Sequence, residues 1–214
     1  MSPAQGAGAL ADVSRYYGEK LREHGASPQG VDWNGRESQR LRFGELLRIR
    51  DGRRDYSLND VGCGYGALLD YLVEQGERCD YLGVDISPAM IEKALELHRG
   101  QAGCRFLVAE RADRTADYTV ASGIFNVKLD APPEHWREHV VQTLVALNAT
   151  SRRGFAFNCL TKYSDAERMR PHLFYADPCE LFDYCKRRFA RDVALLHDYG
   201  LYEFTLLVRK DAGA

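Results

Sequence analysis

An acidic residue and three alternating glycines form the segment of this chain best suited to hold a ligand. Asp60, Gly62, Gly64 and Gly66 follow a strand-like run and precede the helix-like run ALLDYLVEQ. Glycine lets the backbone turn sharply, and it lets a ligand approach without meeting a side chain. The segment therefore predicts a strand-to-helix turn that binds a cofactor.

The spacing of these glycines alone does not identify the cofactor. Gly62, Gly64 and Ala67 also match the GxGxxG/A pattern of dinucleotide-binding domains. Asp60 would repel a pyrophosphate, whereas it suits a ligand that carries ammonium and sulfonium charges. Asp85 stands at the end of the next predicted strand, where a carboxylate can accept hydrogen bonds from both hydroxyls of a ribose. Both kinds of cofactor contain a ribose, so Asp85 does not distinguish them. Asp60 is the residue that favours the cationic cofactor.

Strand-like and helix-like segments alternate after residue 55, which is typical of an α/β domain with a mostly parallel sheet. The hydrophobic pattern predicts strands at about 56–61, 80–85, 104–109, 117–122, 154–160, 192–197 and 202–209. Helix starts are indicated at Ser87-Pro88, at Pro132-Pro133 and at Asp177-Pro178. Residues 1–55 lack a clear strand and predict helices near 11–24 and 35–49. We expect them to form a helical extension of one domain whose cofactor-binding part is 56–214.

These segments resemble the class I S-adenosylmethionine-dependent methyltransferases. The resemblance rests on DVGCGYG at 60–66, on YLGVDISPAM at 81–90, and on the number and order of the predicted strands, and it covers about three quarters of the chain. It implies a Rossmann-like α/β fold, in which a seven-stranded, mostly parallel sheet has helices on both faces and an antiparallel last strand. It also implies S-adenosylmethionine as methyl donor and S-adenosylhomocysteine as product.

The resemblance assigns roles to individual residues. Asp60 and the glycines would hold the amino-acid end of the cofactor, Asp85 would bind the ribose, and Ser122 and Gly123 would flank the reactive methyl. The full set implied to contact the cofactor is Asp60, Gly62, Gly64, Gly66, Asp85, Ile86, Met90, Glu110, Ser122 and Gly123. Asp113 is the alternative to Glu110 near the adenine.

Asn59 departs from the pattern of the family, which usually has an apolar residue at this position of a buried central strand. A buried amide must find hydrogen-bond partners. Either Asn59 has such partners, or the first strand starts later than residue 56.

The acceptor should bind beyond the carboxyl ends of the parallel strands, where residues 122–129, 161–175 and 197–202 project. These segments provide the predicted acceptor contacts Asn126, Tyr163, Tyr175 and Tyr199. If the acceptor is a hydroxyl, His172 or His197 could serve as the general base, because histidine titrates near neutral pH. From the N-terminal segment, Trp33, Arg42 and Phe43 would close over the cofactor, with Arg42 reaching its carboxylate.

Composition narrows the possible partners of the chain. The formal net charge of the 214 residues is -2, and acidic residues interleave the seven arginines between 36 and 54, which argues against a nucleic-acid groove. No apolar run is long enough to span a membrane, and no export signal is evident, so we expect a cytoplasmic protein. The six cysteines have no zinc-type spacing, and we expect no metal site.

The leading hypothesis is methyl transfer to a small organic acceptor. A macromolecular methyltransferase is the first alternative, although the fourth strand ends in SGIFN and lacks the (D/N)PPY motif of base amino-group methylases. An NAD-dependent oxidoreductase would have to tolerate Asp60 beside a pyrophosphate, and a non-catalytic ligand-binding module would lack an acceptor pocket. The atom methylated and the oligomeric state stay open at this point.

Overall fold

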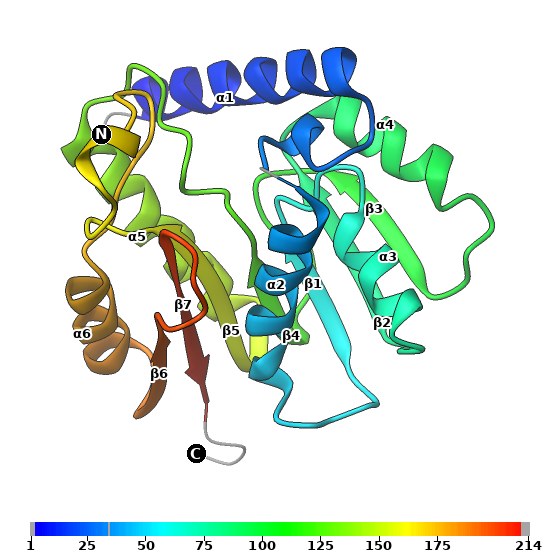
Figure 1. The fold of residues 1–214 in the computed structure, drawn as a ribbon. Coiled ribbons are helices and arrows are strands. Elements are labelled where there is room, and N and C mark those ends of the chain that lie inside the picture. The colour runs from blue at the N-terminus through cyan, green and yellow to red at the C-terminus, as the bar shows by residue number, and fades with distance from the viewer. Residues whose placement is uncertain (1–2, 34, 211–214) are drawn as a thin grey trace.

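The computed structural model describes residues 3–33 and 35–210, and seven strands of this part of the chain form one sheet (Figure 1). Their order is β3-β2-β1-β4-β5-β7-β6. The strands are β1 Ser57–Val61, β2 Asp80–Asp85, β3 Cys104–Val108, β4 Ala116–Ala121, β5 Ser151–Leu160, β6 Asp192–Leu196 and β7 Glu203–Arg209. Strands β1 to β5 are parallel, and β7 runs antiparallel to both β5 and β6. The predicted seven-stranded Rossmann-like sheet with an antiparallel last strand is confirmed.

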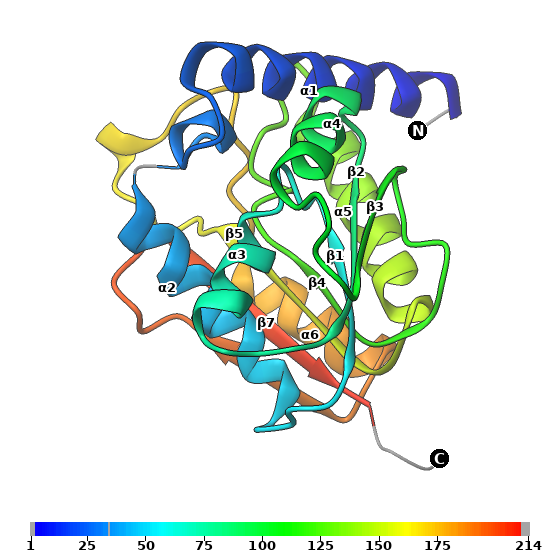
Figure 2. The same cartoon turned by 90° about the vertical axis from the view of Figure 1, so that its right-hand side faces the viewer.

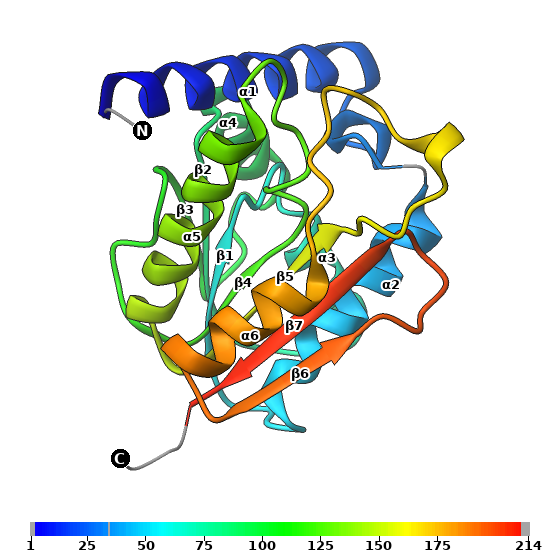
Figure 3. The same cartoon turned by 90° about the vertical axis from the view of Figure 1, so that its left-hand side faces the viewer.

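Helices cover both faces of this sheet (Figures 2 and 3). The α-helices are α1 Pro3–His24, α2 Arg36–Leu47, α3 Ala67–Glu74, α4 Pro88–Leu97, α5 Pro133–Ala149 and α6 Pro178–Arg188, and the short 3-10 turns are η1 Gln29–Val31, η2 Arg48–Arg50 and η3 Ala166–Arg168. Apolar side chains of α2, α3 and α4 share one core cluster with β1, whereas those of α5 and α6 share the other with β5 and β7. None of these described helices is both long and apolar enough to cross a membrane.

Two helix starts follow the capping chemistry expected from the sequence. The Ser87 hydroxyl accepts a hydrogen bond from the Met90 backbone N–H at the start of α4. The Asp177 carboxylate accepts from the N–H groups of Cys179 and Glu180 at the start of α6. Each cap satisfies backbone donors that the first helical turn leaves free, and a proline follows directly at the first helical position.

Helix α1 lies across the carboxyl ends of the parallel strands, along the top of Figure 1. Its Ser14 hydroxyl donates to the Ile86 carbonyl at 3.2 Å, and Val13 is buried in the core cluster that includes α5. The helix begins at Pro3, earlier than the predicted start near residue 11. The first residues are rich in alanine, which favours a helix without the apolar spacing that reveals one in a sequence.

Helix α2 joins the N-terminal segment to the core of the sheet. Phe43, Leu46 and Leu47 are buried in the same cluster as Leu58 of β1 and Tyr118 of β4. This burial removes the apolar surface of α2 from water only when the sheet is present. We therefore infer that residues 1–55 and 56–214 fold as one domain.

Both the amide nitrogen and the amide oxygen of Asn59 have hydrogen-bond partners within the sheet. Its Nδ2 donates to the carbonyls of Arg114 and Thr150 at 3.2 and 3.1 Å, and its Oδ1 accepts from Arg114 Nε at 3.1 Å. The side chain is fully buried. Strand β1 therefore includes residue 59, since the partners that a buried amide requires are present.

Candidate active site

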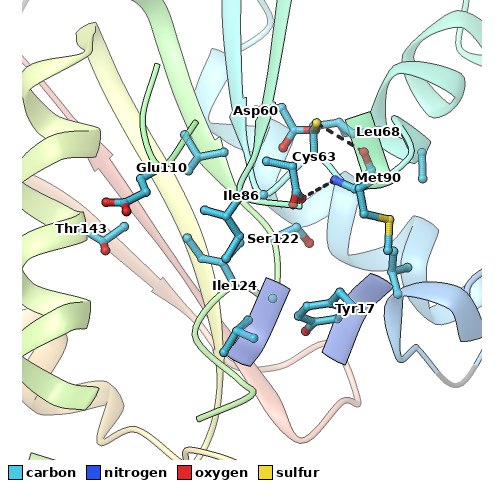
Figure 4. Close-up of a pocket in the computed structure, with 18 of the residues that line it drawn as sticks. Tyr17, Asp60, Cys63, Leu68, Ile86, Met90, Glu110, Ser122, Ile124 and Thr143 are labelled. Carbon is cyan, nitrogen blue, oxygen red and sulfur yellow. Dashed lines mark hydrogen bonds between the residues drawn. The ribbon is translucent and has the colours of Figure 1, made fainter. Parts of the chain in front are cut away.

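A cleft with about 1020 Å³ of empty space, counting the part open to solvent, lies between α1 and the carboxyl ends of β1, β2 and β4. Figure 4 shows its side chains pointing inward from these elements. Of the predicted cofactor contacts, those that line it are Trp33, Asp60, Gly62, Gly64, Asp85, Ile86, Met90, Glu110, Ser122 and Gly123. The fold thus brings most of the predicted site into one place.

Asp60 is the buried acid of this cleft, with only 2% of its surface exposed at the end of β1. The Tyr81 hydroxyl donates to its Oδ2 at 2.7 Å. Burial raises the pKa of Asp60 to about 7, the hydrogen bond from Tyr81 opposes this rise, and the nearby charge of Asp85 adds to it. No ion pair of the described residues neutralises this carboxylate, so a bound cation would relieve the cost of its burial.

Asp85 ends β2 with both carboxylate oxygens anchored to backbone. Its Oδ2 accepts from the Gly64 N–H at 2.9 Å, and its Oδ1 accepts from the Ser87 N–H at 2.8 Å. Burial raises the pKa of Asp85, and these two hydrogen bonds oppose the rise. Each carboxylate oxygen can accept more than one hydrogen bond, so Asp85 keeps capacity for a pair of ligand hydroxyls.

The three glycines of the turn have different structural roles. A Cβ on Gly62, whose φ is +75°, would lie 2.0 Å from Cγ2 of Ile124. Gly64 also has positive φ and presents its backbone to the cleft. Gly66 instead packs against His98, where a Cβ would lie 2.5 Å from Nε2, and it is not among the residues lining the cleft. Gly66 therefore serves the strand-to-helix turn in this structure, rather than the cofactor surface to which the sequence assigned it.

The other end of the cleft carries the acid expected near an adenine. Glu110 lines it beside Ile86 (Figure 4), whereas Asp113 is exposed and forms an ion pair with Arg105 at 2.6 Å. The structure therefore favours Glu110 over Asp113. Thr143 of α5 also lines this end.

Sequence reasoning missed several lining residues because they come from helices that only the tertiary fold brings to the sheet. They are Leu10, Val13 and Tyr17 of α1, Gln39 of α2, and Trp136, His139 and Thr143 of α5. Burial lowers the pKa of His139, so its ring is mostly neutral. Their apolar spacing indicated helix faces and gave no sign that those faces border a ligand site.

Ser122, Gly123 and Trp33 border the middle of the cleft. The Ser122 hydroxyl is buried without a hydrogen-bond partner in the described part of the chain. The Gly123 N–H donates to Asn158 Oδ1 at 2.6 Å. A Cβ on Gly123 would lie 2.5 Å from the Trp33 ring, so the indole packs directly on this glycine.

A second cavity adjoins the cleft, with about 1310 Å³ of empty space including its open mouth. Tyr17, Val31, Trp33 and Gly123 line both spaces. Two of the predicted acceptor contacts, Asn126 and Tyr175, line the second cavity. Their polar groups also support the wall, since Asn126 Oδ1 accepts from the Leu160 N–H and the Tyr175 hydroxyl accepts from the Arg170 N–H.

Arg42 also lines this second cavity, and it is absent from the lining of the cofactor cleft. Its guanidinium forms a two-point ion pair with Glu203 and stacks 3.9 Å from the Trp33 ring. The sequence placed Arg42 at the carboxylate of the cofactor. The structure places it at the second cavity, where Glu203 at the start of β7 holds it.

Four residues predicted for catalysis or for acceptor binding line neither space. Tyr163 is 59% exposed, and the exposed His197 lies beside it with ring centroids 6.0 Å apart. The Tyr199 hydroxyl bonds to Thr205 Oγ1 at 3.0 Å, and burial raises its pKa. His172 contributes its backbone carbonyl to Lys128 and Leu129. In this structure neither imidazole reaches the junction of the cleft and the second cavity.

Comparison with known proteins agrees with this geometry. A family model described as a methyltransferase domain matches residues 59–147. A Mycobacterium tuberculosis protein named "Putative methyltransferase Rv1506c" is 59% identical over 164 residues, which are 77% of this chain and 99% of that protein. The chain belongs to the class I S-adenosylmethionine-dependent methyltransferases. This methyltransferase thus takes S-adenosylmethionine as its cofactor.

Two further similarities are lower in sequence identity or in the share of the chain they cover. The N-methyltransferase NodS of Bradyrhizobium japonicum, solved in complex with S-adenosylhomocysteine, superposes with a TM-score of 0.65 over 92% of this chain and 98% of that one, at 14% identity. This likeness shows the fold. The mouse 18S rRNA (guanine-N(7))-methyltransferase is 46% identical over 52 residues, which are 24% of this chain and 17% of that protein.

The residues of the cleft fit the cofactor of this methyltransferase family. Asp60 is a buried acid without a cationic partner, Asp85 retains capacity to accept hydrogen bonds, and the Ser122 hydroxyl lacks a partner among the described residues. A ligand with an amino group, a ribose and other polar atoms would satisfy these groups. The positive-φ glycines leave its approach open.

Proposed function

We propose that this methyltransferase acts on a small organic acceptor that binds in the second cavity. The observation that carries the proposal is the wall of four residues, Tyr17, Val31, Trp33 and Gly123, that the cavity shares with the cofactor cleft. A ligand in the second cavity would reach the methyl donor at this wall. Small-molecule sites are concave spaces of roughly 300–1,000 Å³, and the second cavity has room for such a ligand, although its wall carries more charged and polar groups than is usual.

The cofactor supplies an electrophilic methyl group when it is bound. In the proposal, Asp60 binds the ammonium of its amino-acid end and Asp85 binds the ribose. Gly123 and Trp33 then fix the boundary across which the acceptor approaches in line. Most of the rate enhancement of such a displacement comes from alignment and from exclusion of water, which α1 provides by covering the strand ends.

A histidine base is not part of this proposal. His172 and His197 are absent from the residues that line the second cavity. Burial raises the pKa of Tyr17, which makes its phenol a poor base at neutral pH. In this proposal, alignment of the acceptor drives the reaction, and neither imidazole acts as a general base.

The similarity to an rRNA methyltransferase does not favour an RNA substrate. The match spans only 24% of this chain, and class I enzymes of many substrate types share the cofactor-binding part of the fold. Of the seven arginines between 36 and 54, arginines 36, 40, 48 and 50 pair with Glu74, Glu45 and Glu77, and Arg42 pairs with Glu203. These pairs remove most of the positive potential that RNA would need.

The test is to incubate the enzyme with methyl-labelled S-adenosylmethionine and cell extract that has been separated into small molecules, RNA and protein. We expect label in the small-molecule fraction. Asp85→Ala should abolish that label, and Asp113→Ala, which alters an exposed acid outside both cavities, should retain it. Label confined to RNA or protein would refute the small-acceptor proposal and would support the macromolecular alternative.

A further inference from the structure

Arg42 has a buried guanidinium group, and one of its nitrogens forms no hydrogen bond with the described residues. Only 5% of the residue is exposed. Nε and Nη2 donate to the two carboxylate oxygens of Glu203 at 2.6 and 2.8 Å, whereas Nη1 has no hydrogen-bond partner in the described part of the chain. A buried N–H group without an acceptor is costly, so this arrangement calls for an acceptor supplied from outside the chain.

The second cavity is the space from which that acceptor can come, because Arg42 lines it. The pair with Glu203 fixes the guanidinium in place at two points, so a ligand would meet a preorganised donor. The guanidinium also stacks on Trp33, which occupies one face of the arginine. A ligand oxygen is thus expected at the edge that carries Nη1.

Two further arginines line the same cavity. Arg168 is 3.9 Å from Asp165, at the limit of an ion pair, and Arg170 Nη1 donates to the backbone carbonyls of Glu167 and Met169. No carboxylate of the described residues forms an ion pair with Arg170. The cavity wall therefore has cationic groups in excess of its acids.

The acids of this wall already have cationic partners. Glu203 is bound by Arg42, and Asp32 accepts from the Tyr16 hydroxyl at 2.8 Å and pairs with Lys20 at 3.3 Å. A cationic ligand would find neither carboxylate free, and the Trp33 and Tyr202 rings of this wall already carry the guanidinium groups of Arg42 and Arg168. The charges of the cavity thus favour an anion over a cation.

We propose that the acceptor of this methyltransferase carries an oxyanion, a carboxylate or a phosphate, which binds Arg42 Nη1 with help from Arg168 and Arg170. This inference rests on the proposed function. Trp33 contacts both Arg42 and Gly123, so the anchoring anion and the nucleophilic atom are separate groups of the acceptor that bind at different parts of the indole. The anion fixes the acceptor, and its other end faces the methyl donor.

The experiment is calorimetry on the enzyme saturated with S-adenosylhomocysteine, with four pairs of aromatic probes. 4-Hydroxybenzoate is compared with 4-hydroxybenzamide, benzoate with benzamide, and phenyl phosphate with phenol, and benzylamine serves as a cationic probe against benzyl alcohol. We expect at least one anion to bind tenfold or more tightly than its neutral partner. Preference for the carboxylates or for the phosphate identifies which oxyanion the site takes.

The variant Arg42→Gln/Glu203→Gln removes both charges of the buried pair together and avoids leaving a lone buried carboxylate. It should lose the preference for the anion and should retain affinity for S-adenosylhomocysteine. Arg170→Gln alters an exposed residue, so it keeps the fold if the double variant does not, and it should weaken the anion about threefold. Arg105→Gln, outside both cavities, is the matched control and should change nothing.

Equal binding of acids and amides, tighter binding of benzylamine, or no binding of any anion would overturn the inference. So would retention of the preference in both arginine variants. These outcomes differ from failure of the proposed function, which appears as label in RNA or protein in the fractionation experiment, or as an enzyme that does not bind S-adenosylhomocysteine.

Discussion

The hydroxyl of Tyr81 in β2 points at the carboxylate of Asp60 in β1 and donates a 2.7 Å hydrogen bond to it. Both side chains are buried, and the two strands are neighbours in the sheet. The acid that begins the cofactor turn is thus held by a neutral donor from the adjacent strand. No cation of the described residues pairs with the ionised carboxylate, so its charge is available to a ligand, and we expect the pKa of Asp60 to set the pH dependence of binding.

Asp60→Asn should stabilise the unliganded protein at pH 8. The folded-state pKa of Asp60 is about 7, above its ordinary value of 3.8. The contribution of this residue to the free energy of unfolding is therefore fully present below about pH 4 and is lost as pH rises through 7. Because each pKa unit is worth about 1.4 kcal/mol, ionised Asp60 costs the fold at most about 4 kcal/mol above pH 7. Thermal melts from pH 4 to 8 should show a gap between variant and wild type that grows with pH. Asp113→Asn, at an exposed acid, should show no such gain.

Cofactor binding should weaken as pH falls below about 7. An ammonium beside Asp60 lowers the pKa of this acid, so a proton must leave for the ligand to bind. The dissociation constant of S-adenosylhomocysteine should then rise toward tenfold per pH unit, as measured by calorimetry between about pH 5.5 and 8. Asp60→Asn should bind more weakly at pH 8 with a flat profile. A flat profile for the wild type would show that Asp60 does not face the ammonium.

Tyr81→Phe should move this pH dependence upward. The tyrosine hydroxyl opposes the rise of the Asp60 pKa, so its removal leaves burial less compensated. We expect the midpoint of the binding profile to rise by about one pH unit, with wild-type affinity regained at higher pH. Tyr118→Phe, whose hydroxyl bonds to the Arg50 carbonyl, is the control and should leave the midpoint in place. A midpoint that stays put in Tyr81→Phe would contradict the role of this hydrogen bond.

Gly123→Ala should displace Trp33. The new Cβ would lie 2.5 Å from the indole at a residue with φ of +74°. Gly76→Ala is the matched control, because its φ is +70° and nothing lies within 4 Å of the added atom. Strain at positive φ costs about 1 kcal/mol in both, and the clash should add about 1–3 kcal/mol in Gly123→Ala alone. Urea unfolding measures the difference, and a red-shifted tryptophan emission should accompany it. Equal stability of the two variants would mean that Trp33 moves freely.

The sequence alone determined the sheet, the glycine turn, Asp60 and Asp85. These features are local: strands alternate with capped helices, and each of the two acids stands at the end of a strand of the predicted parallel sheet, where ligands of such sheets bind. The same locality could not show that Gly66 packs against His98, because a turn glycine that faces a ligand and one that faces His98 have the same neighbours in the chain.

Only the tertiary structure decided which distant residues complete the site. Arg42 and Glu203 are separated by 161 positions, and their pairing holds the arginine at the second cavity rather than at the cofactor cleft. Tyr17 and Thr143 reach the cleft because α1 lies across the strand ends and α5 packs against β4 and β5. Local sequence patterns specify the helices and strands, because helix and strand propensities and capping act within a few residues. The contacts between elements follow from packing and from pairing of buried charges, which couple residues at any distance along the chain.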